Sequence, residues 1–206
     1  MRISVIVPAL DEEREVDAVL DHLCDLDGLD EVVVADGGST DGTTALARAH
    51  PARAVVVEAR GVRPALLNAG AAAASGDVLV FLRPGSRLPL RAAGSLRAAA
   101  ARTGVVGGDF TVRFAGTDPV TRALGLLHAA QRRIGVYDGT SALWCRRDAF
   151  DALGGFRARE GGDGYDFVRR LEARGRTACL PGPVTTPERP PVLPQAVLSR
   201  ALSRVR

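Results

Sequence analysis

The stretch that decides the fold is EVVVADGGSTDGTT, residues 31–44. Its β-branched run, residues 32–34, predicts a buried strand. Gly37 and Gly38 predict a turn, and the Ser39–Thr40 pair with the Ala-rich segment beyond it predicts the start of a helix. The carboxylate of Asp36 is therefore expected at the carboxyl end of a strand, beside a helix N-terminus. In open α/β sheets ligands bind at that place, although an ordinary capping aspartate is the alternative interpretation.

The same alternation of strand and helix continues on both sides of this stretch. Residues 3–7 predict a buried strand closed by Pro8, and the acidic residues 11–13 predict the start of a helix. Further apolar runs predict strands at 54–57 and 78–82, with a helix between them. The repeated alternation predicts a single α/β domain, with a mostly parallel sheet and helices on both faces.

The second half of the chain is less regular. Residues 105–114 alternate moderately and predict an antiparallel edge strand. Residues 1–186 are expected to form the domain, and 187–206 to add a Pro-rich linker and a short amphipathic helix at 195–206. Helices are also expected at 90–102, 119–134, 146–153 and 166–174, and short strands at 143–145 and 178–180.

Composition narrows the function classes. All 27 basic residues are Arg, so no Lys can act as a base or form a Schiff base, and the net charge of +3 is too small to indicate a nucleic-acid binder. Three separated cysteines form no metal-ligand spacing and favour a reduced, cytoplasmic setting. Neither a signal peptide nor a membrane span is expected. The amphipathic segment 195–206 leaves a homodimer contact or a weak membrane contact open.

Several motifs occur in a consistent order. They are ISVIVPALDEE, VVVADGGSTDGT, LLNAGAAAASGDVLVFL, CRRDAFDALGGF and DFVRRLEARGR. Together they resemble family 2 glycosyltransferases, most of all a small bacterial branch, over roughly residues 3–186. The resemblance implies a GT-A fold that binds a nucleoside-diphosphate sugar, transfers the sugar to a small acceptor and inverts the anomeric centre.

The resemblance also implies residue roles. Chemistry supports the roles of Asp36 and Arg63, because a carboxylate accepts an imide N–H and a guanidinium forks onto phosphate. Helix capping is the alternative for Glu12 and Asp41, and a solvated surface position for Arg63. Asn68 and Asp77 are expected to tie turns to the backbone. By position, Pro8 and Ala9 would lie against the nucleoside, Glu12 near the ribose, Asp36 at the base N–H, Ser39 and Asp41 in support of that loop, and Arg63 near the diphosphate.

Three places depart from the family pattern. Gly85 stands where the family carries the carboxylate that grips a divalent metal, so that ligand is missing. Gly164 stands at the position of the expected general base, which leaves Asp163 as the first candidate for a catalytic base. Asp138 is the second candidate, in a loop whose acid is displaced by about two positions. Since a metal usually stabilises the leaving diphosphate, Arg83 or Arg87 is expected to replace it as a fixed cation.

Two interpretations remain open. The first is an enzyme that transfers a sugar from a nucleotide donor to a small acceptor, without a metal or with a weakened need for one. The second is a GT-A relative that has lost transfer, and that binds the nucleotide sugar without turnover or runs another reaction in the same crevice. Nucleotidyl transfer is disfavoured, because it needs a Gly-rich basic loop after the first strand and residues 8–11 read PALD.

Overall fold

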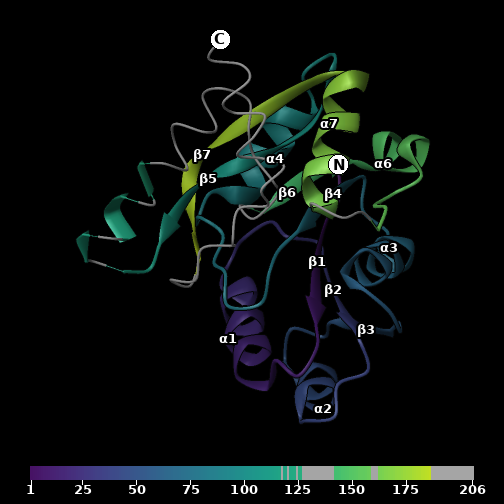
Figure 1. The fold of residues 1–206 in the computed structure, drawn as a ribbon, viewed down its shortest axis with the longest axis vertical. Coiled ribbons are helices and arrows are strands. Elements are labelled where there is room, and N and C mark those ends of the chain that lie inside the picture. The colour runs from purple at the N-terminus through teal and green to yellow at the C-terminus, as the bar shows by residue number, and fades with distance from the viewer. Residues whose placement is uncertain (117, 120, 124, 127–141, 159–161, 187–206) are drawn as a thin grey trace.

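The computed structural model describes residues 1–116, 118–119, 121–123, 125–126, 142–158 and 162–186. Within them, a seven-stranded sheet carries helices on both faces (Figure 1). The strands are β1 (Ile3–Ala9), β2 (Glu31–Asp36), β3 (Val55–Glu58), β4 (Val78–Phe81), β5 (Val105–Phe114), β6 (Leu143–Arg146) and β7 (Arg176–Thr186). The helices are α1 (Glu13–Cys24), α2 (Thr43–Ala49), α3 (Arg63–Ala73), α4 (Ala92–Ala100), α6 (Arg147–Leu153) and α7 (Asp163–Arg174).

The strand order places a topological switch at the centre of the sheet. The order is β3-β2-β1-β4-β6-β5-β7, and every neighbouring pair is parallel except those that β6 makes with β4 and β5. From β1 the chain proceeds outward through β2 to β3, and then returns to β4 on the other side of β1. Ligands bind outside the carboxyl ends of strands at such a reversal. The carboxyl ends of β1, β2 and β4 are therefore the edge to inspect.

Two different helical layers cover the sheet. On one face, α1 and α4 contribute Val19, Leu23 and Leu96 to a buried apolar cluster with β1 and β4. On the other face, α3, α6 and α7 pack around an aromatic group whose members stack or meet edge to face: Phe81, Phe150, Phe156 and Phe167. β1 and β4 are buried on both sides, which is why they read as nearly continuous apolar runs, whereas the edge strand β3 is partly exposed. Helices on both faces of a mostly parallel sheet confirm the predicted architecture.

The prediction of an edge strand at 105–114 is wrong. β5 lies between β6 and β7, and its pairing with β7 is parallel. The backbone approach on both sides is close: a Cβ at Gly107 would lie 2.5 Å from the Trp144 carbonyl oxygen, and one at Gly108 would lie 1.9 Å from that of Ala178. Only glycine fits between two neighbours at these distances. The Gly107-Gly108 pair was therefore the available sign of an interior strand.

Several element boundaries also differ from those predicted. β1 continues through Pro8 to Ala9, and the helix expected from residue 40 begins at Thr43. α7 begins at Asp163 rather than at residue 166, and β7 is longer than 178–180. The predicted helix at 119–134 lies largely outside the described residues, and the helix at 195–206 lies outside them entirely. Among the described helices, none combines the length and apolar character needed to cross a membrane.

Candidate active site

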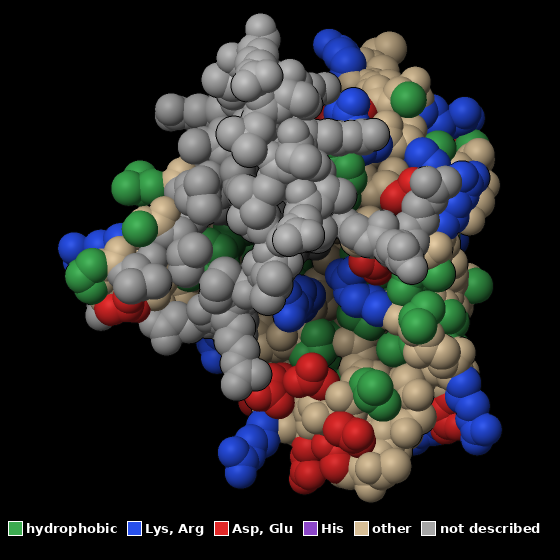
Figure 2. Space-filling view, viewed as in Figure 1, with side chains coloured by type: hydrophobic (Ala, Val, Ile, Leu, Met, Phe, Trp, Pro, Cys, Tyr) green, Lys and Arg blue, Asp and Glu red, His purple; other side chains and the backbone are tan. Residues whose placement is uncertain are grey.

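The candidate site lies at the carboxyl edge of β1, β2 and β4, where three loops meet. The loop after β1 carries Glu12, the loop after β2 carries Ser39 and Asp41, and the loop after β4 carries Arg83. Arg and acidic side chains lie next to one another on this face in the space-filling view (Figure 2). The structure thus brings together predicted residues that are far apart along the chain.

Asp36 ends β2 and holds the turn that follows it. Its side chain is buried, with the residue 2% exposed, and one carboxylate oxygen accepts the backbone N–H of Gly38 at 2.9 Å and that of Ser39 at 3.1 Å. The other oxygen accepts the Ser39 hydroxyl. Burial acts to raise the pKa of Asp36, but these hydrogen bonds outweigh it and hold the pKa below its usual value. Asp36 is therefore an ionised group already well supplied with donors.

The loops after β1 and β2 are braced against each other. Asp11 and Ser39 link them first: the Asp11 N–H donates to Ser39 Oγ at 3.0 Å, and an Asp11 carboxylate oxygen accepts the Thr40 N–H at 2.7 Å. Asp41 extends the brace, since its carboxylate accepts the N–H groups of Glu13 at 3.2 Å and Thr43 at 3.0 Å. The Thr43 hydroxyl, which also donates to Asp41, lowers the pKa of Asp41 most, and these N–H groups add to that effect. Ser39 and Asp41 thus connect the loop after β2 to the loop after β1.

Glu12 lies between the two loops with its side chain half-buried. Its backbone N–H donates to the Thr43 hydroxyl at 2.9 Å. Burial, and then repulsion from Glu15, raise the pKa of Glu12, whereas the Arg83 guanidinium acts in the opposite direction. Arg83, at the end of β4, is thus close enough to Glu12 to act on its charge. Glu12, the predicted ribose contact, and Arg83, a predicted fixed cation, thus influence each other's charge.

Pro8 and Ala9 are the last two residues of β1, and their backbone borders the candidate site. Pro8 pairs with Ala35 in the ladder, and the Ala9 carbonyl accepts the Gly37 N–H at 2.8 Å. Two apolar residues that the sequence did not single out lie beside this backbone. A Cβ at Gly37 would meet Leu66 Cδ2 at 3.2 Å and Leu10 Cδ1 at 3.3 Å, and Leu10 remains 54% exposed. Leu10 therefore presents an exposed apolar side chain beside the turn that Asp36 holds, whereas Leu66 is buried.

Arg63 and Asp163 form an ion pair across the site. Arg63 Nη1 lies 2.7 Å from Asp163 Oδ2, although the residues are 100 positions apart. Arg63 is the first residue of α3 and Asp163 the first residue of α7. The sequence assigned these residues separately, one to the diphosphate and one to base catalysis, and gave no sign that they touch.

The helices that carry this pair are held in place by Asn68, which the sequence predicted to tie a turn, and by two arginines that the sequence did not single out. Asn68 of α3 exchanges two hydrogen bonds with the Phe156 backbone, at 2.8 and 2.9 Å, as expected of a residue that ties a turn. Asp77 likewise accepts the Arg2 N–H at 2.8 Å. Arg147 donates to three carbonyls at and beyond the end of α3, those of Ala71, Ala74 and Gly76. Arg170 of α7 pairs with Asp166 and donates to the carbonyls of Leu153 and Gly155.

The position where the family carries a metal-binding carboxylate holds no carboxylate in this chain. The segment after β4 reads Arg83, Pro84 and Gly85, and Gly85 has a φ of 74° and no side chain to offer. Among the described residues, no group of three or more His, Cys, Asp or Glu side chains is arranged to hold a metal ion. A guanidinium repels a divalent cation, so the residues at this position do not fit the metal that the family implies.

The two candidate cations at this edge have different surroundings. Arg87 pairs through its backbone with Thr185 of β7, at 2.8 and 3.0 Å. Its guanidinium lies near His22 of α1: burial lowers the pKa of His22 and Arg87 adds to that effect. Arg83 instead acts on Glu12. Arg83 therefore acts on a candidate site residue, whereas Arg87 acts on a histidine of α1 outside the candidate set. Asp138, the second candidate base, lies outside the described residues.

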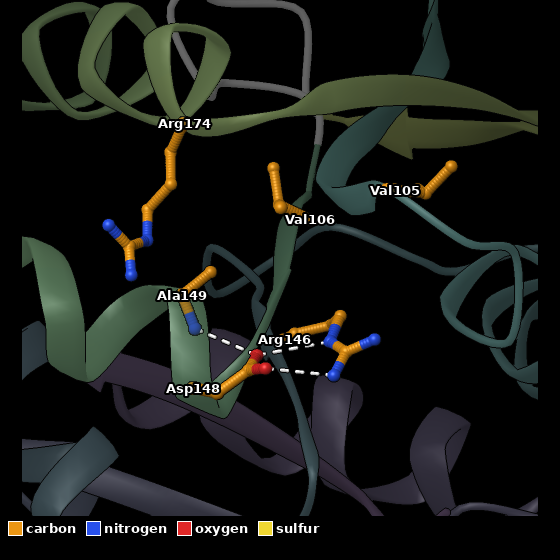
Figure 3. A pocket seen from close by; sticks show the side chains of 7 residues that line it. Val105, Val106, Arg146, Asp148, Ala149 and Arg174 are labelled. Carbon is orange, nitrogen blue, oxygen red and sulfur yellow. Dashed lines mark hydrogen bonds and ion pairs between the residues drawn. The ribbon is translucent and has the colours of Figure 1, made fainter.

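A separate cavity of about 380 Å³ lies away from this site (Figure 3). Its lining includes Val105 at the start of β5, Arg146 at the end of β6 and Arg174 at the end of α7, which places it at the opposite, amino edge of the sheet. Arg146 and Asp148 form a two-point ion pair there, at 3.0 and 2.8 Å. Hydrogen bonding to Arg146 lowers the pKa of Asp148. Of the predicted site residues that the structure describes, none lines this cavity.

A mixed, mostly parallel sheet with a strand-order reversal between β1 and β4, and with arginines and carboxylates at the carboxyl ends of those strands, is typical of a nucleotide-binding α/β fold. The model of the glycosyl transferase family 2 matches residues 4–159. The chain therefore belongs to glycosyl transferase family 2.

Individual relatives agree with this assignment. Glucosyl-3-phosphoglycerate synthase of Mycobacterium tuberculosis is 45% identical over 89 residues, which cover 39% of this chain and 28% of that protein. The match thus spans under a third of the length of the curated relative. Its crystal structure with Mn²⁺, UDP-glucose and phosphoglyceric acid has a TM-score of 0.65 at 26% identity, covering 98% of this chain and 79% of the other. Mannosyltransferase PcManGT of Pyrobaculum calidifontis, in complex with GDP-mannose and Mn²⁺, has a TM-score of 0.70 at 23% identity, with 98% and 64% covered.

Proposed function

We propose that the protein transfers a sugar from a nucleoside-diphosphate sugar to a small acceptor hydroxyl. The observation that carries the proposal is the braced pair of loops at the β1/β4 switch point, with Arg63 and Arg83 on the side where a diphosphate would extend. Such preorganisation of loops at a strand reversal suits a nucleotide, and forked cations suit phosphate. Membership of glycosyl transferase family 2 supports the same class of reaction.

The nucleoside half of the proposal assigns roles to backbone and side chains around β1 and β2. Pro8 and Ala9 form the floor under the nucleoside, and Glu12 receives the ribose hydroxyls. Asp36 accepts the base N–H in addition to holding its turn. Because its oxygens already accept donors from Gly38 and Ser39, we expect the contact to the base to be the weaker of its two tasks.

The diphosphate half of the proposal replaces a metal by arginine. Arg83 occupies the end of β4, where the family places its metal, and the described site residues do not fit a metal ion. A guanidinium placed there stabilises the negative charge that develops on the leaving diphosphate. Arg63 supplies a second forked donor. We therefore propose that transfer does not require a divalent ion.

In the reaction, the acceptor oxygen attacks the anomeric carbon as the bond from that carbon to the diphosphate oxygen breaks. The electron pair leaves with the nucleoside diphosphate, next to Arg83. The proton of the acceptor hydroxyl passes to Asp163, the candidate general base, directly or through one water. Attack from the face opposite the leaving group inverts the anomeric centre, as the family resemblance implies.

The acceptor class is proposed from the relatives. Glucosyl-3-phosphoglycerate synthase has been crystallised with phosphoglyceric acid as well as with UDP-glucose. A small acid that carries a phosphate is therefore the first acceptor class to try, and UDP-glucose the first donor. The homodimer, the membrane contact of residues 195–206 and the cytoplasmic setting stay predictions.

The test is a turnover assay by chromatography, with UDP-glucose or GDP-mannose as donor and phosphoglyceric acid as acceptor. Each reaction is run with EDTA and with Mn²⁺. We expect acceptor-dependent release of nucleoside diphosphate at similar rates in both conditions. Complete loss of turnover in EDTA would rule out the proposal that arginine replaces the metal. The proposed transferase function would still stand.

A second candidate function is binding of a nucleotide sugar without transfer. The observation that favours it is the Arg63–Asp163 ion pair, which ties up the candidate base. Tight binding of a nucleoside diphosphate with no turnover of any donor, in the presence or absence of Mn²⁺, would establish this alternative.

A further inference from the structure

Arg63, which the proposed function assigns to the donor diphosphate, is already paired with the Asp163 carboxylate. Arg63 is the first residue of α3, whose first turn contains no acidic residue and whose N-cap, Val62, contributes no side-chain hydrogen bond. A cation at a helix N-terminus adds to the positive end of the helix dipole and needs an anion nearby. The Asp163 carboxylate provides that anion at 2.7 Å.

The packing of the two helices enforces this meeting. Asn68 ties α3 to the Phe156 backbone, and Phe156 stacks on Phe167 of α7 with ring centroids 4.4 Å apart. Arg170 ties α7 to the turn that contains Gly155. The N-termini of α3 and α7 are therefore held near each other by buried contacts, and the Arg63 and Asp163 side chains meet where the two helices begin.

The ion pair itself is weak enough to be exchanged. The Arg63 side chain is 40% exposed and that of Asp163 is 20% exposed. Exposed pairs of this kind contribute little to stability, and a diphosphate offers Arg63 more charge and more acceptor oxygens than one carboxylate does.

Resting on the proposed function, we infer that Asp163 is a resident counter-anion which the donor diphosphate displaces from Arg63. Binding of the donor transfers Arg63 to the phosphates and releases the Asp163 carboxylate toward the acceptor. The candidate base is thus paired while the site is empty and becomes available once a donor is bound. Donor binding therefore precedes activation of the acceptor, because Asp163 stays paired with Arg63 until the diphosphate replaces it.

The test is calorimetric titration of UDP and GDP into the full-length protein and its Asp163→Asn variant. Removing the competing carboxylate is expected to tighten binding of the diphosphate by about two- to fivefold, the range for an exposed ion pair. The bare nucleoside is expected to bind both proteins equally, because it does not reach Arg63. A purely structural role for Asp163 would not separate these two ligands.

Two further variants complete the design. Asp148→Asn removes the carboxylate of another exposed arginine pair, at the amino edge, and is expected to leave both affinities unchanged. In an Arg63→Met background, Asp163→Asn is expected to give no tightening. If the wild-type protein binds a nucleoside diphosphate and Asp163→Asn fails to tighten it, displacement is wrong and the proposed function stands. If the wild-type protein binds neither diphosphate, both are overturned.

Discussion

The two halves of this molecule fix their loops with opposite charges. Around β1 and β2, the carboxylates of Asp11, Asp36 and Asp41 accept backbone N–H groups. Around α3, α6 and α7, the guanidiniums of Arg147 and Arg170 donate to backbone carbonyls. The same contrast reaches the candidate site, where a cation stands at the place of an expected carboxylate. This chain thus holds the loops of one half with carboxylates and those of the other half with guanidiniums.

The largest expected effect tests the cation at the end of β4. Arg83→Ala is expected to lower kcat by about 10²–10³-fold, the range for removal of one preorganised stabiliser of transition-state charge. Arg87→Ala is the matched control, since its guanidinium lies near His22, and it is expected to change kcat by less than about threefold. Equal losses in both variants would contradict the assignment of Arg83. Steady-state kinetics with EDTA present provides the measurement.

The next largest expected effect is the loss of stability when a guanidinium that holds the second half together is removed. Arg147→Met removes charge-assisted hydrogen bonds to the carbonyls of Ala71, Ala74 and Gly76, and is expected to cost about 2–3 kcal/mol of unfolding free energy. Arg169→Met, which breaks only a surface pair with Glu172, is expected to cost under about 0.5 kcal/mol. Urea unfolding followed by circular dichroism compares them. Similar urea midpoints for the two variants would show that Arg147 does not stabilise the end of α3.

The carboxylate brace is expected to contribute slightly less. Asp36→Ala leaves the N–H groups of Gly38 and Ser39 without their acceptor in a buried turn, at a cost of about 1–3 kcal/mol. The control is Asp77→Ala, which removes an acceptor from the exposed N–H of Arg2. The same urea experiment applies, and a larger loss for Asp77→Ala than for Asp36→Ala would contradict the account of the turn.

The smallest effect is a difference in acid sensitivity between the halves. The pKa values of Asp36 and Asp41 are lowered from 3.8, so the unfolded chain binds more protons than the folded one. Their stabilisation is present above pH 3.8 and is lost as the pH falls through the lower folded values, whereas Arg braces stay charged. Hydrogen exchange at pH 3 is expected to show earlier opening around residues 36–43 than around 147–156. The reverse order would contradict the comparison.

The sequence predicted the fold where local signals suffice. β-Branched runs located β1, β2 and β4, and the positions of Asp36, Ser39 and Asp41 follow from turn and cap chemistry. It failed for β5, because strand order in a sheet depends on long-range packing that periodicity does not carry. It could not predict that Arg63 meets Asp163, since that contact depends on how α3 and α7 pack around the phenylalanines. Only the Gly107-Gly108 pair offered a local sign of such a long-range feature.

We propose above all that the braced loops after β1 and β2, with Arg63 and Arg83, bind a nucleoside diphosphate without a metal. Calorimetric titration of UDP and GDP into the protein in EDTA, repeated in Mn²⁺, tests it most directly. We expect one of the two nucleotides to bind at a single site, with the same Kd in both conditions to within about twofold. Binding of neither nucleotide, or binding that appears only when Mn²⁺ is added, would contradict it.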